Sequence, residues 1–314
     1  MKLVMFQGYG DPRLGSLEDA GIVDLNLAYE AMLAETGDLR ARVKAEAVVP
    51  AETVAFLQGG DDSLAAAAEA RDWGLAHKDA KYRNMPVFWA TADTRLLAPV
   101  LKPEKIICVA HNYHDFCKEL GMEPHAEPRI FSKFANAVVG WDEPVVRPAM
   151  SKALGYEAEL SFVVGKRCKN VPEDKAYEYI AGYTTSNDVS ASDLTKRDVQ
   201  NTRGKGFDSF AVLGQYILTK DELPDPHNLG VYLRVNGKTL QESNTRELVH
   251  DVPQLLSFCS QVFTLEPGDI VMTGTPGGLA KDRTPPTFMD PGDVMETEIE
   301  KLGIARNPIE EEKI

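Results

Sequence analysis

Two glutamates and an aspartate have the residue types and the spacing of a metal site. Glu157 and Glu159 stand two positions apart in the strand-like segment 155–165, and Asp188 follows 29 positions after Glu159. Side chains two apart on a strand point the same way, with α-carbons about 6.5 Å apart, so both carboxylates can reach one small cation. The alternative is an edge strand with a solvated acidic face. Residues 160–164 favour the metal site, because they continue from the acids as a buried apolar strand in which a charge needs a partner.

The chain between these acids predicts how they meet. Residues 172–180 begin with a proline and two acids, as the first turn of a helix often does, and Gly182 would end that helix. The apolar and β-branched run 183–189 then carries Asp188 near its end. We expect a strand, a helix and a strand to form a crossover that brings Asp188 beside the glutamates. Three carboxylates make a hard oxygen site, which favours Mg²⁺ or Mn²⁺ over zinc.

Composition sets the class of protein. The 314 residues suffice for two domains or one large one, and a hydrophobic content of 43% indicates a globular chain. The formal net charge of -14 argues against nucleic acid or an anionic membrane as a partner. Four cysteines lack a CxxC pair or zinc spacing and are expected to be reduced thiols: Cys108, Cys117, Cys168 and Cys259. The apolar run at residues 1–6 is too short for a signal peptide or a membrane span, so we expect a cytoplasmic protein.

The predicted secondary structure changes near residue 100. Residues 1–100 predict a small N-terminal α+β domain, with strands at 2–7 and 20–25, helices at 27–47 and 62–75, and a proline-marked connector at 86–103. Residues 101–314 predict a mostly β catalytic domain with a helix at 252–264 and seven main strands: 105–110, 160–165, 183–189, 215–219, 230–236, 269–273 and 293–299. This pattern favours a rolled mixed sheet over a doubly wound one. No GxGxxG, P-loop or GxSxG motif is present.

Several separate segments together resemble the fumarylacetoacetate hydrolase family. They are residues 105–109 (KIICV), 112–113 (NY), 155–160 (GYEAEL), 182–191 (GYTTSNDVSA), 202–208 (TRGKGFD), 265–269 (LEPGD) and 273–277 (TGTPG). The resemblance implies an α+β fold of the family's mixed β-roll type, a homodimer and a requirement for Mg²⁺ or Mn²⁺. It also implies a small-molecule substrate that is a 2-oxo acid or a 1,3-dicarbonyl compound.

The resemblance assigns roles to particular residues. It implies that Glu157, Glu159 and Asp188 are metal ligands and that Lys205 is the active-site lysine. Five further residues fall on motif positions that line or close the family's pocket: Asn112, Tyr113, Gln200, Arg203 and Thr275. Lys205 lies between two glycines, which suits close approach to a ligand but also a simple turn. The segment 273–277 can likewise hold a carboxylate or merely end a strand.

These residue types suit chemistry on a 2-oxo acid. The ketone and one carboxylate oxygen can chelate the metal, which acts as a Lewis acid for the enolate. Lys205 would add positive charge where negative charge develops. In the family, a histidine followed three positions later by a glutamate activates water from a short lid helix.

The chain departs from the family at this histidine. Glu119 is retained, but Phe116 occupies the histidine position and cannot move protons. We therefore predict Lys205, Glu119 and His114 as catalytic residues, with His114 as a shifted base. His111 and His125 are the alternatives for that base. Two positions where many family members have arginine and glutamine are also different, namely Ser192 and Thr195.

The leading hypothesis is a metal-dependent hydrolase that cleaves a carbon-carbon bond in an acylpyruvate or a related diketo acid. A first alternative is a decarboxylase or isomerase of a 2-oxo dioic acid such as oxaloacetate, which needs enolate stabilisation but no attacking water. A second is a catalytically silent relative that binds a metabolite. Phe116 motivates this last alternative, whereas the three acids and Lys205 argue against it.

Overall fold

The first hundred residues form a small meander with helices packed on it. A computed structural model of the chain describes residues 1–313. The strands here are β1 (Lys2–Gln7), β2 (Arg13–Glu18), β3 (Gly21–Asp24), β4 (Lys81–Tyr82), β5 (Met85–Pro86), β6 (Phe88–Trp89) and β7 (Arg95–Leu97). The helices are α1 (Leu25–Glu35), α2 (Ala41–Val48), α3 (Thr53–Gln58), α4 (Gly60–Ala76) and the 3-10 turn η1 (Thr91–Asp93).

Two expectations for this region need correction. The single helix predicted over 27–47 is broken into α1 and α2, because the chain turns at Gly37, which has a φ of 83°. The predicted connector at 86–103 contains β6 and β7, and β7 pairs with β1, so part of it belongs to the sheet. Of the prolines that suggested a connector, Pro86 ends the two-residue strand β5, and Pro99 and Pro103 lie beyond β7.

The remainder of the chain is richer in strands, and all seven predicted main strands are present. Its strands are β8 (Ile106–Ala110), β9 (Arg129–Lys133), β10 (Val138–Val139), β11 (Val145–Arg147), β12 (Leu154–Gly155), β13 (Ala158–Val164), β14 (Ile180–Asp188), β15 (Ser190–Ala191), β16 (Ala211–Leu213), β17 (Ile217–Thr219), β18 (Gly230–Val235), β19 (Lys238–Asn244), β20 (Ile270–Met272), β21 (Val294–Ile299) and β22 (Ile304–Glu311). Its helices are α5 (His114–Glu119), α6 (Ser192–Asp198), α7 (Thr202–Lys205) and α8 (Val252–Val262), with 3-10 turns η2 (Ala135–Ala137), η3 (Glu173–Tyr179), η4 (Thr245–Glu247) and η5 (Ala280–Asp282).

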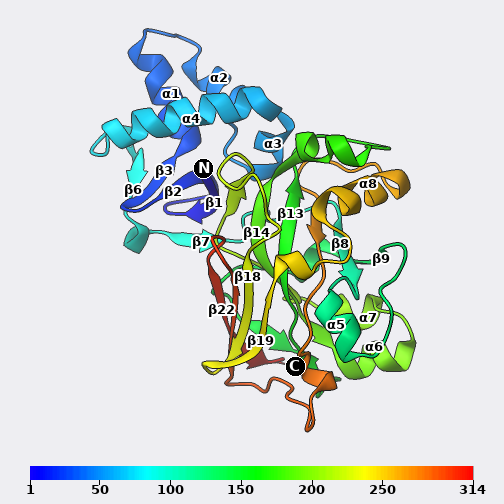
Figure 1. Cartoon of the computed structure of the whole chain (residues 1–314). Coiled ribbons are helices and arrows are strands. Elements are labelled where there is room, and N and C mark those ends of the chain that lie inside the picture. The colour runs from blue at the N-terminus through cyan, green and yellow to red at the C-terminus, as the bar shows by residue number, and fades with distance from the viewer. Residues whose placement is uncertain (314) are drawn as a thin grey trace.

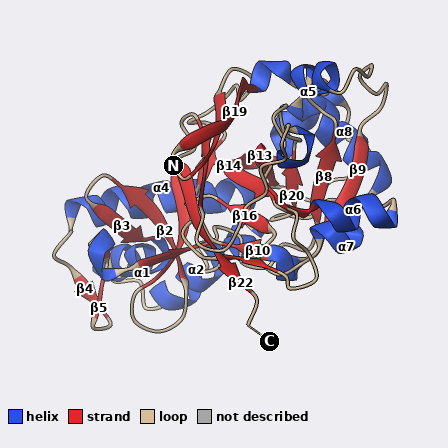
Figure 2. Ribbon diagram, turned by 90° about the horizontal axis from the view of Figure 1, so that it is seen from below, coloured by secondary structure: helices blue, strands red, loops and turns tan. Residues whose placement is uncertain are grey.

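One large sheet links the two halves of the chain (Figure 1). It has 13 strands, and its main path runs β6-β3-β2-β1-β17-β14-β13-β20-β8-β9. A second sheet of five strands runs β11-β22-β21-β18-β19. Both sheets lie between helices at the two ends of the molecule (Figure 2). Parallel pairs such as β20 with β8 stand beside antiparallel ones, which confirms the predicted α+β class with mixed sheets. The division at residue 100 stays a prediction, because β1 pairs with β17 across it.

The strands that carry the acids lie in the middle of this sheet. Every residue of β13 and β14 is buried, including the five polar residues 184–188 at the end of β14. The predicted crossover is wrong: β13 and β14 are adjacent and antiparallel, with Glu159 opposite Ser186. The connecting helix is only the seven-residue turn η3, too short to return the chain to a parallel strand. No helix in the described part of the chain is long and apolar enough to cross a membrane.

Candidate metal centre and active-site cavity

The three acids meet where β13 begins and β14 ends. Oxygen atoms of Glu157, Glu159 and Asp188 lie within 4.8 Å of one another. Glu157 precedes β13, and its backbone is tied to the end of β14: its amide donates to Asn187 Oδ1 (3.0 Å), and its carbonyl accepts from the amide of Asp188 (3.0 Å). Antiparallel pairing therefore places the third acid beside the first two, although the predicted topology was different.

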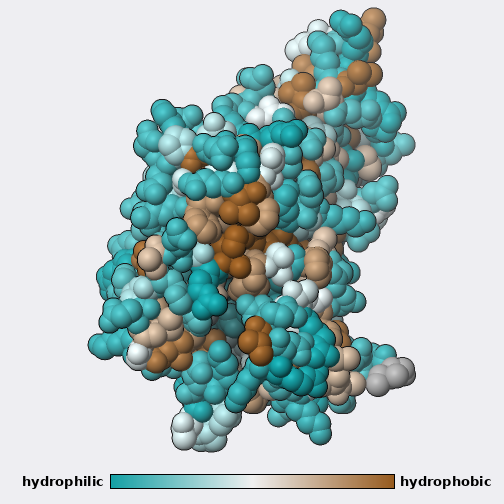
Figure 3. Space-filling view, turned by 90° about the vertical axis from the view of Figure 1, so that its right-hand side faces the viewer, coloured by the Kyte–Doolittle hydropathy of each residue, from teal (hydrophilic) through white to brown (hydrophobic). Residues whose placement is uncertain are grey.

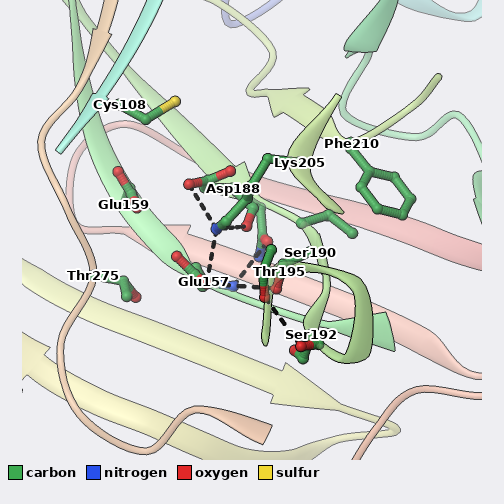
Figure 4. A network of polar contacts seen from close by, with 12 residues as sticks. Cys108, Glu157, Glu159, Asp188, Ser190, Ser192, Thr195, Lys205, Phe210 and Thr275 are labelled. Carbon is green, nitrogen blue, oxygen red and sulfur yellow. Dashed lines mark hydrogen bonds and ion pairs between the residues drawn. The ribbon is translucent and has the colours of Figure 1, made fainter. Parts of the chain in front are cut away.

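Two buried lysines face the acids. Lys205 Nζ lies 2.8 Å from both Glu157 Oε1 and Asp188 Oδ2. Figure 4 shows this amino group directed at the two carboxylates, with Glu159 beside them. Lys133 Nζ lies 2.6 Å from Asp188 Oδ1 and donates its hydrogen bonds to three backbone carbonyls, those of Val189, Lys205 and Phe210. The site thus has three carboxylates and two ammonium groups.

Sequence reasoning missed Lys133. It ends β9, a strand whose other residues are exposed or half-buried, so neither apolar periodicity nor a motif points inward there. Its side chain is nevertheless fully buried. A buried lysine needs several acceptors, and these come from segments far apart in sequence.

The charges in this centre suit a divalent cation. Burial raises the pKa of Glu159 well above its usual range, and Asp188 and Glu157 add to the rise. Burial also opposes charge on Asp188, but Lys133 and Lys205 outweigh it and lower the pKa of that carboxyl. Asp188 Oδ1 is buried and forms an ion pair with Lys133 Nζ at 2.6 Å. The three clustered carboxylates make an all-oxygen donor set, which fits Mg²⁺ or Mn²⁺.

The turn after β20 holds one of the acids in place. The amide of Gly274 donates to Glu159 Oε2 at 2.7 Å, and Thr275 Oγ1 donates to the carbonyl of Ala158 at 3.0 Å. Gly274 has a φ of 99°, and a Cβ there would come within 2.8 Å of the Asn112 Cβ. The segment 273–277 therefore does hold a carboxylate, but it is the chain's own Glu159.

A cavity of about 980 Å³ opens over this centre. Its lining includes Glu157, Lys205 and Thr275 from the acidic centre, together with His111, Phe116 and Arg129. Lys205 Nζ also lies 5.4 Å from the centre of the Phe131 ring, which belongs to the same lining. The side of the molecule that carries α5, α6 and α7 has apolar side chains gathered at the centre of its surface, beside a hollow (Figure 3).

The predicted substrate-binding residues lie in three different places. Gln200 and Thr275 line the cavity. Asn112 is buried, and its side-chain amide is occupied by the backbone of His250 and Thr273. Tyr113 is fully buried outside the lining, and Arg203 is exposed and paired with Asp198. The structure thus places Asn112 and Tyr113 behind the wall of the cavity and Arg203 on the outer surface.

The candidates for the base also separate. Phe116 lines the cavity, whereas Glu119 Oε2 accepts a hydrogen bond from the amide of Gly278 (2.8 Å). His114 is exposed and lines a different cavity, beside Lys118 and Glu242. His111 lines the main cavity, and its Nδ1 lies 3.3 Å from His125 Nε2. Among the described residues, His111 is the only histidine that lines the cavity together with Glu157 and Lys205.

Comparison with known proteins gives consistent matches. The fumarylacetoacetate (FAA) hydrolase C-terminal model matches residues 105–310. A mitochondrial oxaloacetate tautomerase of Xenopus laevis is 40% identical over 315 positions, which cover 98% of this chain and 90% of that protein. The structure of fumarylacetoacetate hydrolase from psychrophilic Exiguobacterium antarcticum is 30% identical, with a TM-score of 0.80 over 99% of this chain and 100% of that one. Maleylpyruvate hydrolase from Sphingobium sp. SYK-6, in complex with manganese (II) and pyruvate, is 27% identical, with a TM-score of 0.74 over 100% of both chains.

Proposed function

The chain belongs to the fumarylacetoacetate hydrolase family, and we propose that it is a divalent-metal-dependent isomerase that interconverts the keto and enol forms of a 2-oxo dicarboxylate of the oxaloacetate class. The observation that carries this proposal is the 40% identity to an oxaloacetate tautomerase over 98% of the chain. The geometry agrees with it, because enolisation requires stabilised negative charge and a proton acceptor but no attacking water. The identity to a tautomerase thus supports the predicted isomerase alternative over the hydrolase hypothesis.

The chain's own residues have distinct tasks in this proposal. Glu157, Glu159 and Asp188 would hold Mg²⁺ or Mn²⁺, which would supply Lewis-acid polarisation of the 2-oxo group and its neighbouring carboxylate. Lys205, at 2.8 Å from two of these acids, places a positive charge beside the oxygen that becomes an enolate. Lys133 fixes Asp188 from behind.

The rest of the cavity suits a second carboxylate on the substrate. Arg129, Lys196 and Lys281 line it together with Lys205, so cations face the space from several sides. Their charge offsets the negative net charge of the chain locally. Ser192 and Thr195 line the same cavity, where they leave room that arginine and glutamine would fill. We propose that a small dicarboxylate is held between the metal centre and Arg129 or Lys281.

Hydrolysis of an acylpyruvate is the second candidate function. It is favoured by the similarity to maleylpyruvate hydrolase, whose structure contains manganese (II) and pyruvate. Phe116 counts against it, since this side chain occupies the cavity wall where the family histidine would activate water. The predicted homodimer and cytoplasmic location stay predictions.

The test compares reactions of one protein preparation. Enolic oxaloacetate is mixed with the protein and Mg²⁺, Mn²⁺ or a chelator, and the loss of enol absorbance is followed alongside release of carbon dioxide and pyruvate. We expect metal-dependent loss of the enol without decarboxylation, and no cleavage of acetylpyruvate. Glu159→Gln should abolish the metal response, while Glu173→Gln, at an exposed glutamate of η3, serves as the matched control. Cleavage of acetylpyruvate at a comparable rate would instead favour the hydrolase.

A further inference from the structure

His111 is placed like a reacting group. It is half-buried in the wall of the main cavity, next to Phe116, and the two ring centres lie 5.6 Å apart. Its Nδ1 lies 3.3 Å from His125 Nε2, and the two imidazole rings are tilted by 36°. Its other ring nitrogen, Nε2, makes no hydrogen bond within residues 1–313. A structural histidine is expected to satisfy both nitrogens, whereas this one keeps one nitrogen free in a cavity that holds Lys205.

The backbone holds His111 in a costly conformation. Its φ is 55°, in the left-handed region that few residues other than glycine adopt, although asparagine, aspartate and histidine are enriched there. Such strain persists where surrounding contacts fix it, and it gathers at functional sites. Here the carbonyl of His111 accepts from Cys117 Sγ (3.5 Å), and the next residue, Asn112, is bonded to the backbone of His250.

The same bonds position His125. His250 Nε2 lies 3.0 Å from the carbonyl of His125, so the segment anchored by Asn112 also holds the loop of the second histidine. Three histidines from separate segments are therefore connected through Asn112. This explains the otherwise puzzling burial of Asn112 behind the cavity wall: it fixes the geometry of the pair.

We infer that His111 Nε2 is the proton acceptor and donor of this active site, and that His125 positions His111 and shares its proton. This inference rests on the proposed function. A proton leaves C3 of the substrate for Nε2, the electron pair of the broken C–H bond forms the C2–C3 double bond, and the ketone oxygen takes up the negative charge. Return of the same proton to that oxygen gives the enol. Proton and electrons balance without an oxidant or another reactant.

The bond to His125 lets the pair work in both directions. When His111 Nδ1 carries the hydrogen and donates it to His125, Nε2 of His111 is a base. When His125 Nε2 donates instead, Nε2 of His111 carries a hydrogen and is an acid. A glutamate partner would only stabilise the charged imidazole. A histidine partner therefore suits a reversible proton transfer better than a hydrolysis that must hold one protonation state.

The electrostatic surroundings keep this base uncharged. Burial lowers the pKa of His111, and His125, Lys281 and Arg129 lower it further, while Asp282 opposes them. His111 is thus in its neutral form near neutral pH. The cations that keep it neutral are the same groups that would attract a second carboxylate of the substrate.

The positive φ of His111 limits which substitutions can test its role. His111→Asn keeps a residue that tolerates positive φ and an amide that can still reach His125, but it removes Nε2. The readout is exchange of the methyl protons of pyruvate with D₂O in the presence of Mg²⁺, followed by NMR, together with calorimetric binding of oxalate. We expect exchange to fall roughly 10²–10⁴-fold with oxalate binding unchanged. His77→Asn, at an exposed histidine that ends α4, is the control for the substitution itself.

His125 needs a different readout because it acts through His111. His125→Ala should raise the pKa of His111, because the repulsion from His125 is lost, and so move the acidic limb of the pH profile of kcat/KM to higher pH. His125→Gln keeps a hydrogen-bonding side chain without the charge, so it should restore part of the rate while the limb stays at higher pH. A merely structural role would lower the rate without moving this limb.

Several outcomes would overturn the inference. They are undiminished exchange in His111→Asn, loss of exchange in His114→Asn but not in His111→Asn, and a wild-type protein that binds oxalate with Mg²⁺ yet exchanges no protons. Failure of the proposed function looks different: exchange would depend on His111 while oxaloacetate stayed at its uncatalysed rate of tautomerisation. Proton exchange and the natural substrate are thus tested separately.

Discussion

The acidic centre and the histidine pair face one cavity but are held by different parts of the fold. Glu159 and Asp188 lie on adjacent central strands and are 1% exposed, whereas His111 and His125 lie on half-buried loops around α5. Strand pairing gives the acids a fixed spacing, and two buried lysines compensate their charge. The histidines are held by a few hydrogen bonds to backbone. A metal centre requires fixed charge, while a proton-transfer group must change its charge without unfolding its surroundings.

His111, His125 and the neighbouring Phe116 are called the histidine wall below. The difference in how the two regions are held predicts that substitutions of the acidic centre affect folding, while those of the two histidines affect mainly the reaction. Within the acidic centre the two lysines divide these roles. Lys133 is bonded to three carbonyls behind Asp188, and Lys205 lines the cavity. Lys133 and Lys205 contact the same carboxylate of Asp188. The same substitution at each lysine therefore tests whether folding and reaction depend on different residues.

The largest effect on stability is expected for Lys133→Met. It removes the amino group that donates hydrogen bonds to three backbone carbonyls. It also leaves the buried Asp188 with one cation in place of two. The free energy of unfolding should fall by about 3–5 kcal/mol, as when one member of a buried ion pair is removed. Urea unfolding with chelator present measures this loss. A fall below about 1 kcal/mol would contradict the role given to Lys133.

Lys205→Met is the counterpart on the cavity side of the same aspartate. We expect kcat to fall roughly 10²–10³-fold, the usual loss when one group that stabilises an oxyanion is removed. The loss of stability should be smaller than for Lys133→Met when Mn²⁺ is present, because the metal can neutralise the carboxylates that Lys205 leaves. Steady-state kinetics and thermal unfolding with Mn²⁺ check both statements. Equal loss of stability in the two variants would remove the distinction between them.

A third variant, Phe116→His, tests the histidine wall from the other side. Phe116 is buried with Tyr113, Leu248 and Leu279, so an imidazole there should lower the free energy of unfolding by about 1–3 kcal/mol. It also restores the family's spacing to Glu119. We expect release of pyruvate from acetylpyruvate to appear or increase, measured with a coupled pyruvate assay. Phe116→Leu is the control, and no gain over that control would show that the phenylalanine alone does not prevent hydrolysis.

The sequence predicted the acidic centre better than the histidine wall for a physical reason. Glu157 and Glu159 are two positions apart in sequence, which is a local signal, although only Glu159 lies on β13 and Glu157 lies just before it. Asp188 ends β14, the next long strand. The family of the chain could likewise be predicted from its motifs. The antiparallel direction of β13 and β14 could not, because η3 resembles the start of a longer helix in sequence.

Contacts between segments that are far apart in the sequence are not indicated by any spacing of residues along the chain. Lys133 meets carbonyls that belong to residues 189, 205 and 210, and His111 meets His125 across a loop. Neither contact has a period that sequence spacing reveals. The nearness of His114 to the family position predicts a role as base, but its place at the start of α5 puts it in the lining of another cavity. Its predicted catalytic role stays a prediction that the His114→Asn variant tests.

The smallest effect is expected in the pH dependence of stability. The pKa of His111 is lowered by burial and by His125, so the unfolded chain takes up a proton at this residue before the folded chain does. As pH falls below the ordinary value of 6.5, the unfolded state binds more protons and stability decreases; the loss ends once pH is below the lowered pKa of the folded state. His111→Asn should therefore flatten the slope of unfolding free energy between neutral pH and that window, whatever its effect at neutral pH. Urea unfolding at several pH values, with His77→Asn beside it, measures the slopes. Identical slopes in wild type and His111→Asn would mean that the pKa of His111 is the same in the folded and the unfolded chain. His111 would then be as solvated as a residue on an open surface.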